Sequence, residues 1–353
     1  MGNNNSFSRF KKIYFQLNMQ KLLVIFLFAL VPFCANSQNA KNEKDSLLFL
    51  LQKTFLVIKQ NSVYKSVIDW DSLKAQIFDQ PETIRTKEDL IPRVQLIFKT
   101  IGDRHGAFYL NGKRIGEKLP EIHVRESLID PFGNGKIPIK TKIVDKEIGY
   151  ILIPGNGMND NISKIAQSIQ DSLCLLNPRR LKGIIVDLRL NEGGSIYPLF
   201  TGLHQLIGDG VFGAFTDLNG KQNDQWRLKK GKYYQYNRIV ASVKSKCSCP
   251  KNLKVAVLIS QITASAGEDL AIALKGRPNT IFIGEKTYGF TTGIATYRVD
   301  GNLLAIASSF VADRTGKIYK NGVPPDVEIV EGDDFEHLSK DKKINEAIKW
   351  IRQ

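Results

Sequence analysis

The sequence predicts an α/β fold preceded by a helical subdomain. Amphipathic helical segments fill residues 38–100, and from Ile148 onward short apolar runs alternate with amphipathic segments, as in βαβ units. The chain has 353 residues, of which 42% are hydrophobic and 24% charged, the balance of a globular protein with about two domains. Disordered, collagen-like and coiled-coil classes are therefore excluded.

Residues 1–37 are typical of a secretory signal peptide. They contain four basic residues and no acidic residue, and the apolar run at 22–35 is shorter than a membrane span. Small residues before Gln38 predict cleavage at that point, and Met19 is an alternative start. The exported chain is expected in a periplasm or outside the cell, with no stable membrane span.

Two lipid anchors are weaker alternatives for this segment. Cys34 is a possible lipidation site, but the preceding Phe33 is bulky where such sites need a small residue. The first six residues match a myristoylation pattern, which leaves the apolar run unexplained. The signal peptide is favoured over both.

The chain is basic, with a formal net charge of +15 that falls to +11 without the four basic residues of the signal segment. Residues 209–254 hold ten basic and three acidic residues, interleaved with Trp226, Tyr233, Tyr234 and Tyr236. Such a mixture is also typical of surfaces that bind single-stranded nucleic acid. For an exported protein we favour a solvated excursion of the chain whose excess positive charge has no binding role, so nucleic acid is a disfavoured partner. An acidic substrate or an anionic membrane surface is an open alternative.

Three regions follow the signal segment. Residues 38–100 are expected to form an N-terminal helical subdomain, and residues 101–147 a connecting segment of loops and short strands that carries His105. Residues 148–353 are expected to form the α/β domain, with strands at 148–153, 183–188, 255–259 and 280–283 and helices at 162–176, 196–207, 265–275 and 344–351. This alternation predicts a mostly parallel sheet that is covered on both faces.

A buried strand turns directly into a helix at Thr263-Ala-Ser-Ala-Gly-Glu268. A serine at such a turn lies among free backbone N–H groups at the positive end of the helix dipole, where a developing oxyanion is stabilised. The alternative is that Thr263 or Ser265 only caps the helix. Taken alone the segment favours capping, so Ser265 becomes a candidate nucleophile only together with the other segments.

A second buried strand ends in Asp187-Leu-Arg-Leu-Asn-Glu-Gly-Gly194. The paired glycines Gly193 and Gly194 let the backbone approach a ligand and point N–H groups at it, as an oxyanion hole requires. The segment is equally compatible with an ordinary strand-to-helix turn that holds a structural ion pair between Asp187 and Arg189.

His105 is the candidate general base, because histidine can activate a serine near neutral pH. Asp103, two residues earlier, is a candidate for orienting the imidazole, and a structural role is the alternative for a lone histidine. A histidine base predicts activity that rises as the pH passes about 6.5. The other three histidines lack the spacing of metal ligands, so neither a metal nor a cofactor is expected.

Taken in order, these segments resemble peptidase family S41, the tail-specific (C-terminal processing) and tricorn-type proteases. The similar pieces are Gly102-Asp-Arg-His105, Ile148-Gly-Tyr-Ile-Leu-Ile-Pro, the turn from Asp187 to Gly194, Thr263-Ala-Ser-Ala-Gly-Glu268, Gly284-Glu-Lys-Thr-Tyr-Gly289 and Gly322-Val-Pro-Pro-Asp326. The resemblance spans residues 101–330. It implies a crotonase-like (ClpP-like) spiral core of βαβ units, serine peptidase chemistry, Ser265 as nucleophile, and an oxyanion hole from the N–H groups of Ala266 and of Gly193 or Gly194.

The resemblance leaves the base to be chosen between two branches. Tail-specific proteases carry a lysine in a Gly-x-x-Thr-Phe-Gly-Lys motif, but here Phe290 stands at that position. Lys286, four residues earlier, is only a fallback base. The tricorn-like branch pairs its serine with an early histidine, and His105 matches that placement, so a dyad of Ser265 and His105 is expected.

Two departures limit what the resemblance implies. The residues directly before Gly322 are Tyr319-Lys320-Asn321, so no carboxylate stands where the tricorn-type acid belongs. The roughly 40 residues between His105 and Ile148 leave no room for a PDZ domain. The expected function is an exported serine peptidase that acts on peptides or unfolded protein segments. The alternative is a catalytically inactive protein of the same fold that binds an apolar ligand, a peptide or a partner.

The cysteines are too few for a disulfide-built fold. Cys247 and Cys249 are expected to be either two loop thiols or a local bridge, and a soft-metal site that uses both is a weaker alternative. Cys174 is expected to be buried on its helix.

Overall fold

The computed structural model describes residues 36–119, 121–133, 135–158 and 161–353. Residues Glu43–Gln353 form one compact unit, and helix α2 spans Asn36–Asn61. The predicted signal segment, including Cys34, lies outside the described residues except for its last two, which begin α2. In the described ranges no helix has the length and apolarity needed to span a bilayer.

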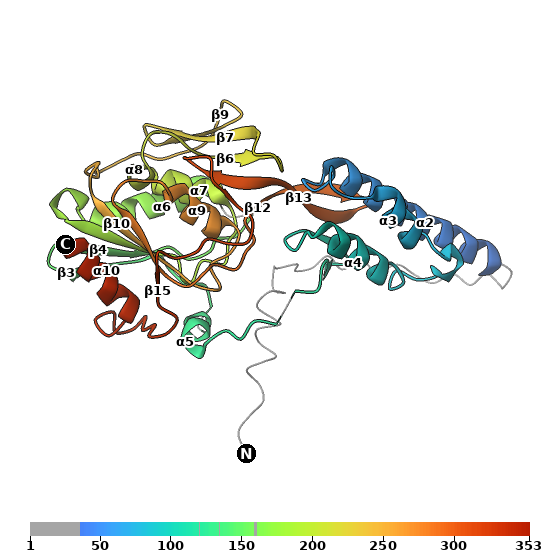
Figure 1. Cartoon of the computed structure of the whole chain (residues 1–353), viewed down its shortest axis with the longest axis horizontal. Coiled ribbons are helices and arrows are strands. Elements are labelled where there is room, and N and C mark those ends of the chain that lie inside the picture. Colours follow the sequence, from blue (N-terminus) through green and yellow to red (C-terminus); the bar gives the residue numbers. More distant parts are fainter. Residues whose placement is uncertain (1–35, 120, 134, 159–160) are drawn as a thin grey trace, which may run out of the picture. The chain divides into compact units, whose positions relative to one another are not determined.

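A six-stranded sheet forms the predicted α/β part of the chain (Figure 1). Its order is β15-β11-β10-β5-β4-β3, and all neighbours are parallel except β3 and β4. The strands are β3 (Lys140–Asp145), β4 (Ile148–Leu152), β5 (Gly183–Asp187), β10 (Lys254–Ile259), β11 (Thr280–Gly284) and β15 (Val327–Glu328). The mostly parallel sheet predicted from the sequence is confirmed.

Both faces of this sheet are buried, because alternate residues of each strand enter different cores. In β10, Val257 belongs to the core that contains α6, α7 and α9, whereas Leu258 belongs to the core that contains α10. The helices are α6 (Ile162–Leu175), α7 (Ile196–Gly202), α8 (His204–Ile207), α9 (Ala266–Leu274) and α10 (Lys342–Arg352), with a 3-10 turn η3 (Pro178–Arg180).

A second, nine-stranded sheet was not predicted. Its main order is β2-β1-β13-β6-β7-β8-β9, with β12 and β14 also paired to β13, and every pairing is antiparallel. The strands are β1 (Ala107–Leu110), β2 (Lys113–Ile115), β6 (Gly210–Thr216), β7 (Gln222–Lys229), β8 (Lys232–Gln235), β9 (Arg238–Ser242), β12 (Thr292–Val299), β13 (Asn302–Asp313) and β14 (Ile318–Tyr319).

The expectation of a solvated excursion at residues 209–254 is wrong, because β6 to β9 are four of the nine strands of this sheet. Trp226 and Tyr233 are fully buried, and both rings pack against Phe200 of α7, at centroid distances of 4.8 and 5.6 Å. Burial alternates along β7, so one face of the strand is solvated and the other is core. The basic residues and the aromatic core therefore share the same strands on opposite faces.

The stretch predicted to be helical contains α2, α3 (Trp70–Ile77), the 3-10 turn η1 (Pro81–Thr83) and α4 (Leu90–Ile101). Their apolar faces share one core with β1, β2 and the β12–β13 hairpin, which includes Phe98, Phe108 and Leu304. The connecting segment adds α5 (Glu126–Ile129) and the turn η2 (Asp130–Phe132) to its strands. The domain boundaries predicted from the sequence stay a prediction.

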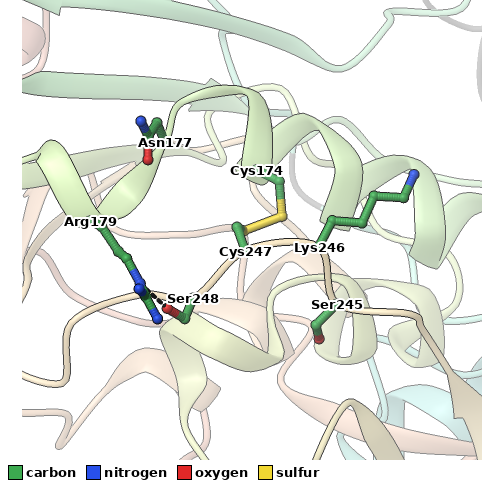
Figure 2. Close-up of a pocket in the computed structure, with 7 residues that line it drawn as sticks. All are labelled: Cys174, Asn177, Arg179, Ser245, Lys246, Cys247 and Ser248. Atoms are coloured by element: carbon green, nitrogen blue, oxygen red, sulfur yellow. Dashed lines mark hydrogen bonds between the residues drawn. A yellow bond between two sulfur atoms is a disulfide. The ribbon is translucent and has the colours of Figure 1, made fainter.

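The cysteine pairing differs from the expectation. Cys174 on α6 forms a disulfide with Cys247, with Cα atoms 5.3 Å apart, and Cys249 is a free thiol. The bond lines an open pocket beside Asn177 and Arg179 (Figure 2). Neither a local bridge nor a buried Cys174 thiol occurs, because the fold brings together two cysteines that are 73 residues apart.

Candidate active site

Ser265 lies in a strained turn at the start of α9. Its backbone angles, φ +51° and ψ −120°, are rare for a residue with a side chain and typically cost about 1–3 kcal/mol. The turn is held by long-range bonds, since the Thr263 hydroxyl donates to the Leu188 carbonyl at 2.8 Å and the Ala264 N–H donates to the Asn191 carbonyl at 2.9 Å. Thr263 therefore fixes the turn to the end of β5 and does not cap α9.

The turn that follows β5 lies directly against Ser265. Both Gly193 and Gly194 have φ near +115°, a conformation that glycine adopts at no steric cost. A Cβ on Gly193 would lie 2.9 Å from the Ser265 Cβ, and a Cβ on Gly194 would lie 1.8 Å from the Asn156 carbonyl oxygen. Only glycine fits at Gly194, which explains the paired glycines in the sequence.

Asn191 holds this turn and was not recognised in the sequence. Its Nδ2 donates to the carbonyls of Ile153 and Pro154 at 3.2 Å each, and its Oδ1 accepts the Gly193 N–H at 3.1 Å. The Gly193 amide is thus already engaged. Within the described part of the chain, the N–H groups of Gly194 and Ala266 have no hydrogen-bond acceptor.

His105 is half-buried just before β1 and is held by the start of β12. Its Nδ1 lies 3.1 Å from the Thr292 carbonyl oxygen and 3.0 Å from the Thr292 hydroxyl. Because a carbonyl oxygen only accepts hydrogen bonds, Nδ1 carries the proton and Nε2 keeps a lone pair. The ring stacks on Phe290, with centroids 4.6 Å apart and planes 13° apart. Burial lowers the pKa of His105 to about 4, which keeps the imidazole neutral.

Asp103 does not orient the imidazole. Its buried carboxylate accepts the N–H of Gly106 at 2.7 Å and the N–H of Ala307 at 2.8 Å. It therefore fastens the His105 loop to β13, and the partner of Nδ1 is Thr292. The sequence contained no signal for Thr292, because the two residues are 187 positions apart.

The fallback base, Lys286, is exposed, whereas Phe290, which stands at the position of the lysine in tail-specific proteases, is buried. No hydrogen bond joins Ser265 to His105 among the described residues. The two are connected through Phe290, whose ring stacks on His105 and whose N–H donates at 2.7 Å to Glu268, the residue that also accepts the Ser265 N–H.

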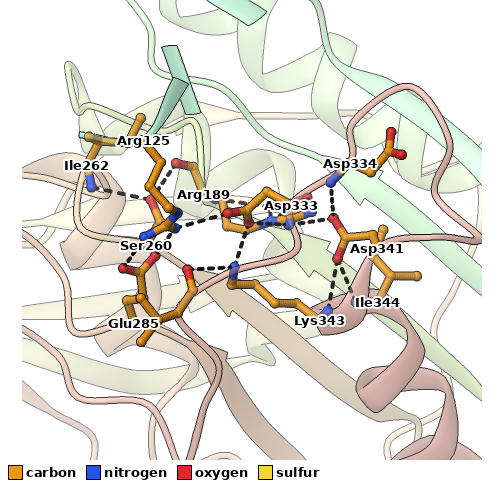
Figure 3. Close-up of polar contacts among 12 residues, drawn as sticks. Arg125, Arg189, Ser260, Ile262, Glu285, Asp333, Asp334, Asp341, Lys343 and Ile344 are labelled. Atoms are coloured by element: carbon orange, nitrogen blue, oxygen red, sulfur yellow. Dashed lines mark hydrogen bonds and ion pairs between the residues drawn. The ribbon is translucent and has the colours of Figure 1, made fainter. Parts of the chain in front are cut away.

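The predicted ion pair between Asp187 and Arg189 is present and belongs to a larger buried cluster (Figure 3). The Arg189 guanidinium is fully buried and lies 2.7 Å from each of Asp187, Asp333 and Asp341. The Ser260 hydroxyl also donates to the Arg189 carbonyl at 2.7 Å. This cluster joins the end of β5, which precedes the glycine turn, to the C-terminal segment. The sequence did not predict Asp333 and Asp341 as partners of Arg189, because they are distant from it in the chain.

Ser265 thus lies at a strained helix N-terminus beside a glycine turn, and Glu268 and Phe290 link it to the neutral His105. A family model described as peptidase family S41 matches residues 147–329, just over half of the chain. The chain belongs to peptidase family S41, a family of serine peptidases.

Two named proteins are similar to this chain in sequence. The nisin-resistance protein of Lactococcus lactis subsp. lactis is 27% identical over 289 residues, or 80% of each chain. The carboxy-terminal processing protease CtpA of Bacillus subtilis (strain 168) is 30% identical over 197 residues, which is 54% of this chain and 37% of that protein.

Two solved structures share the fold. A lipoprotein from Streptococcus agalactiae has a TM-score of 0.60 at 20% identity, covering 93% of this chain and 99% of its own. The photosystem II D1 C-terminal processing protease has a TM-score of 0.54 at 16% identity, covering 81% and 93%. The fold is thus the mixed α/β fold of C-terminal processing proteases.

Proposed function

We propose that this protein is an exported serine peptidase in which Ser265 is the nucleophile and His105 the general base. The observation that carries the proposal is the pair of environments described above. Ser265 is held in a strained turn between unengaged N–H groups, and His105 is held neutral with Nε2 unprotonated. A crotonase-like spiral of the βαβ units around β4, β5 and β10 is part of the proposal.

The reaction would proceed by acyl transfer. His105 Nε2 takes the proton of the Ser265 hydroxyl while Oγ attacks the carbonyl carbon of the peptide bond. The N–H groups of Ala266 and Gly194 stabilise the tetrahedral oxyanion, since the Gly193 N–H is bonded to Asn191. His105 then protonates the leaving amine, and a water molecule hydrolyses the acyl-enzyme after losing its proton to His105.

Two observations support a peptide substrate outside the cytoplasm. A relative that matches 80% of the chain is named for nisin resistance, which makes nisin a candidate substrate to test beside unfolded proteins. The disulfide between Cys174 and Cys247 is of the kind that persists in oxidising compartments. Together with the predicted signal peptide, these support export.

Labelling with a fluorophosphonate tests the nucleophile. The purified wild-type protein should be labelled and should hydrolyse an unfolded protein or nisin, and S265A should lose both, because the attacking oxygen is gone. Far-UV circular dichroism of S265A serves as the folding control. A folded wild-type protein that is neither labelled nor active would support the alternative, an inactive S41 protein that binds a peptide, an apolar ligand or a partner.

A further inference from the structure

Glu268, three residues after Ser265, has an unusual set of contacts. Its side chain is fully buried, and its carboxylate accepts four hydrogen bonds. Oε2 accepts the N–H groups of Ser265 at 3.0 Å and Phe290 at 2.7 Å, and Oε1 accepts the N–H of Gly289 at 2.8 Å and the hydroxyl of Thr287. Every strong acceptor position of this carboxylate therefore faces a donor.

These donors come from separate parts of the chain that meet at the active site. One is the Ser265 turn, and the others lie in the loop of residues 287–290. The Thr287 hydroxyl in turn accepts the N–H of Val323 at 2.7 Å. Val323 follows Gly322, so Thr287 connects the Glu268 carboxylate indirectly to the Gly322-Val-Pro-Pro-Asp326 segment.

The same loop holds His105 from two sides. The Phe290 ring stacks on the imidazole, and Thr292, two residues further on, binds Nδ1. Resting on the function proposed above, we infer that Glu268 is a positioning residue that sets the Ser265 turn in register with the loop that carries His105. Its carboxylate acts through three backbone N–H groups and the Thr287 hydroxyl, and within the described residues it forms no hydrogen bond with the imidazole or with the Ser265 hydroxyl.

A simpler role for Glu268 is helix capping. Ser265 and Glu268 have the spacing of a capping box, and an acidic residue in the first turn of α9 interacts favourably with the helix dipole. Capping alone explains the bond to Ser265. It does not explain the three bonds to residues 287–290, which only a link between the two segments requires.

The two roles differ in their dependence on pH. Four donors suit the carboxylate anion, because a protonated carboxyl would turn an O–H toward one of them. Burial raises the pKa of Glu268 to about 7, and the titratable groups near it are Asp269 on the same helix and Tyr288 on the facing loop. Labelling of Ser265 should therefore rise as the pH increases through about 7.

Stability should change in the opposite sense, since a raised carboxyl pKa makes ionisation between about 4.5 and 7 unfavourable to the folded state.

The test is the rate of fluorophosphonate labelling of the full chain between pH 5 and 9. E268Q should lower the plateau rate about 100-fold, the usual effect of a misplacement of about 1 Å, and should remove the rise near pH 7. T287V keeps Glu268 but removes one donor to the anion, so the rise should persist and move to higher pH. This milder variant decides the matter if E268Q does not fold.

Asp269→Asn is the matched control. Asp269 is a buried carboxyl on the same helix that accepts no side-chain hydrogen bond within the described ranges, so its variant should keep the wild-type plateau and rise. If E268Q is labelled at the wild-type rate with the same pH profile, or if T287V leaves the profile unmoved, the positioning role is wrong. Because labelling itself would persist in those cases, the nucleophile assignment would stand.

Discussion

The two sheets contribute to the active site in different ways. The parallel sheet supplies Ser265 and the glycine turn after the adjacent strands β10 and β5, and the backbone carbonyls of Leu188 and Asn191 accept the bonds that hold the Ser265 turn. The antiparallel sheet supplies Thr292 at the start of β12 and His105 just before β1, and the two residues are joined through the His105 imidazole.

This difference shows which part of the site is set locally. Adjacent parallel strands end at the same edge, so the nucleophile and the oxyanion donors come together once the sheet forms. The base depends on contacts between residues 187 positions apart and on the stacking of one ring on another.

Removing the base should have the largest effect. H105A should lower kcat/KM for a peptide substrate at least about 1,000-fold, as losses of catalytic histidines usually do. The Ser265 turn should be unaffected, because its bonds go to Leu188 and Asn191. Steady-state kinetics with the unfolding midpoint as control checks this, and a variant within tenfold of wild type would remove His105 from the mechanism.

Breaking the covalent link between the two regions should reduce stability. Cys174 lies on α6 beside the parallel sheet, and Cys247 follows β9 of the antiparallel sheet. A loop of this length predicts a loss of about 4 kcal/mol of unfolding free energy in C174S/C247S. Chemical denaturation measures the loss. C249S, which leaves the disulfide intact, should be close to wild type, and equal stability of all three proteins would contradict the prediction.

A side chain on the glycine turn should damage the site more than the fold elsewhere. G194A places a Cβ against the Asn156 carbonyl and displaces an oxyanion donor, so labelling of Ser265 should slow by about 100-fold or more. G208A is the matched control, because Gly208 also has positive φ but open space around it. Similar slowing in both variants would mean that backbone strain alone is responsible.

The smallest expected effect is the pH dependence of stability that His105 contributes. Its pKa is lowered to about 4 in the folded protein, so the unfolded chain takes up a proton first as the pH falls below about 6.5. This contribution is fully present above pH 6.5 and is lost as the pH falls toward 4. Unfolding free energies of wild type and H105Q should therefore converge in that window, and parallel curves would contradict it.

The pH expectation drawn from the sequence changes for the same reason. An ordinary histidine predicts activity that rises near pH 6.5, but the buried ring of His105 moves its own titration to about 4. A rise near 7 would then belong to Glu268. In the sequence, Glu268 stood only at the end of the Thr263-Ala-Ser-Ala-Gly-Glu268 segment, for which helix capping was one of two interpretations, and nothing there indicated a link to residues 287–290.

The sequence alone predicted the parallel sheet and the glycine turn at Gly193 and Gly194, and its resemblance to family S41 indicated the candidates Ser265 and His105. Buried strands, helix starts and glycine turns are local patterns, and they follow from the period of the backbone and the steric freedom of glycine. It did not determine the antiparallel sheet, in which Trp226 is buried among basic strands.

Only the tertiary structure decided the partners. The bond from His105 to Thr292, the disulfide between Cys174 and Cys247, and the contacts of Glu268 with residues 287–290 join segments that are distant in the chain. Such contacts depend on where whole elements pack, because no local pattern records which side chains the folded core brings within a few ångströms of each other.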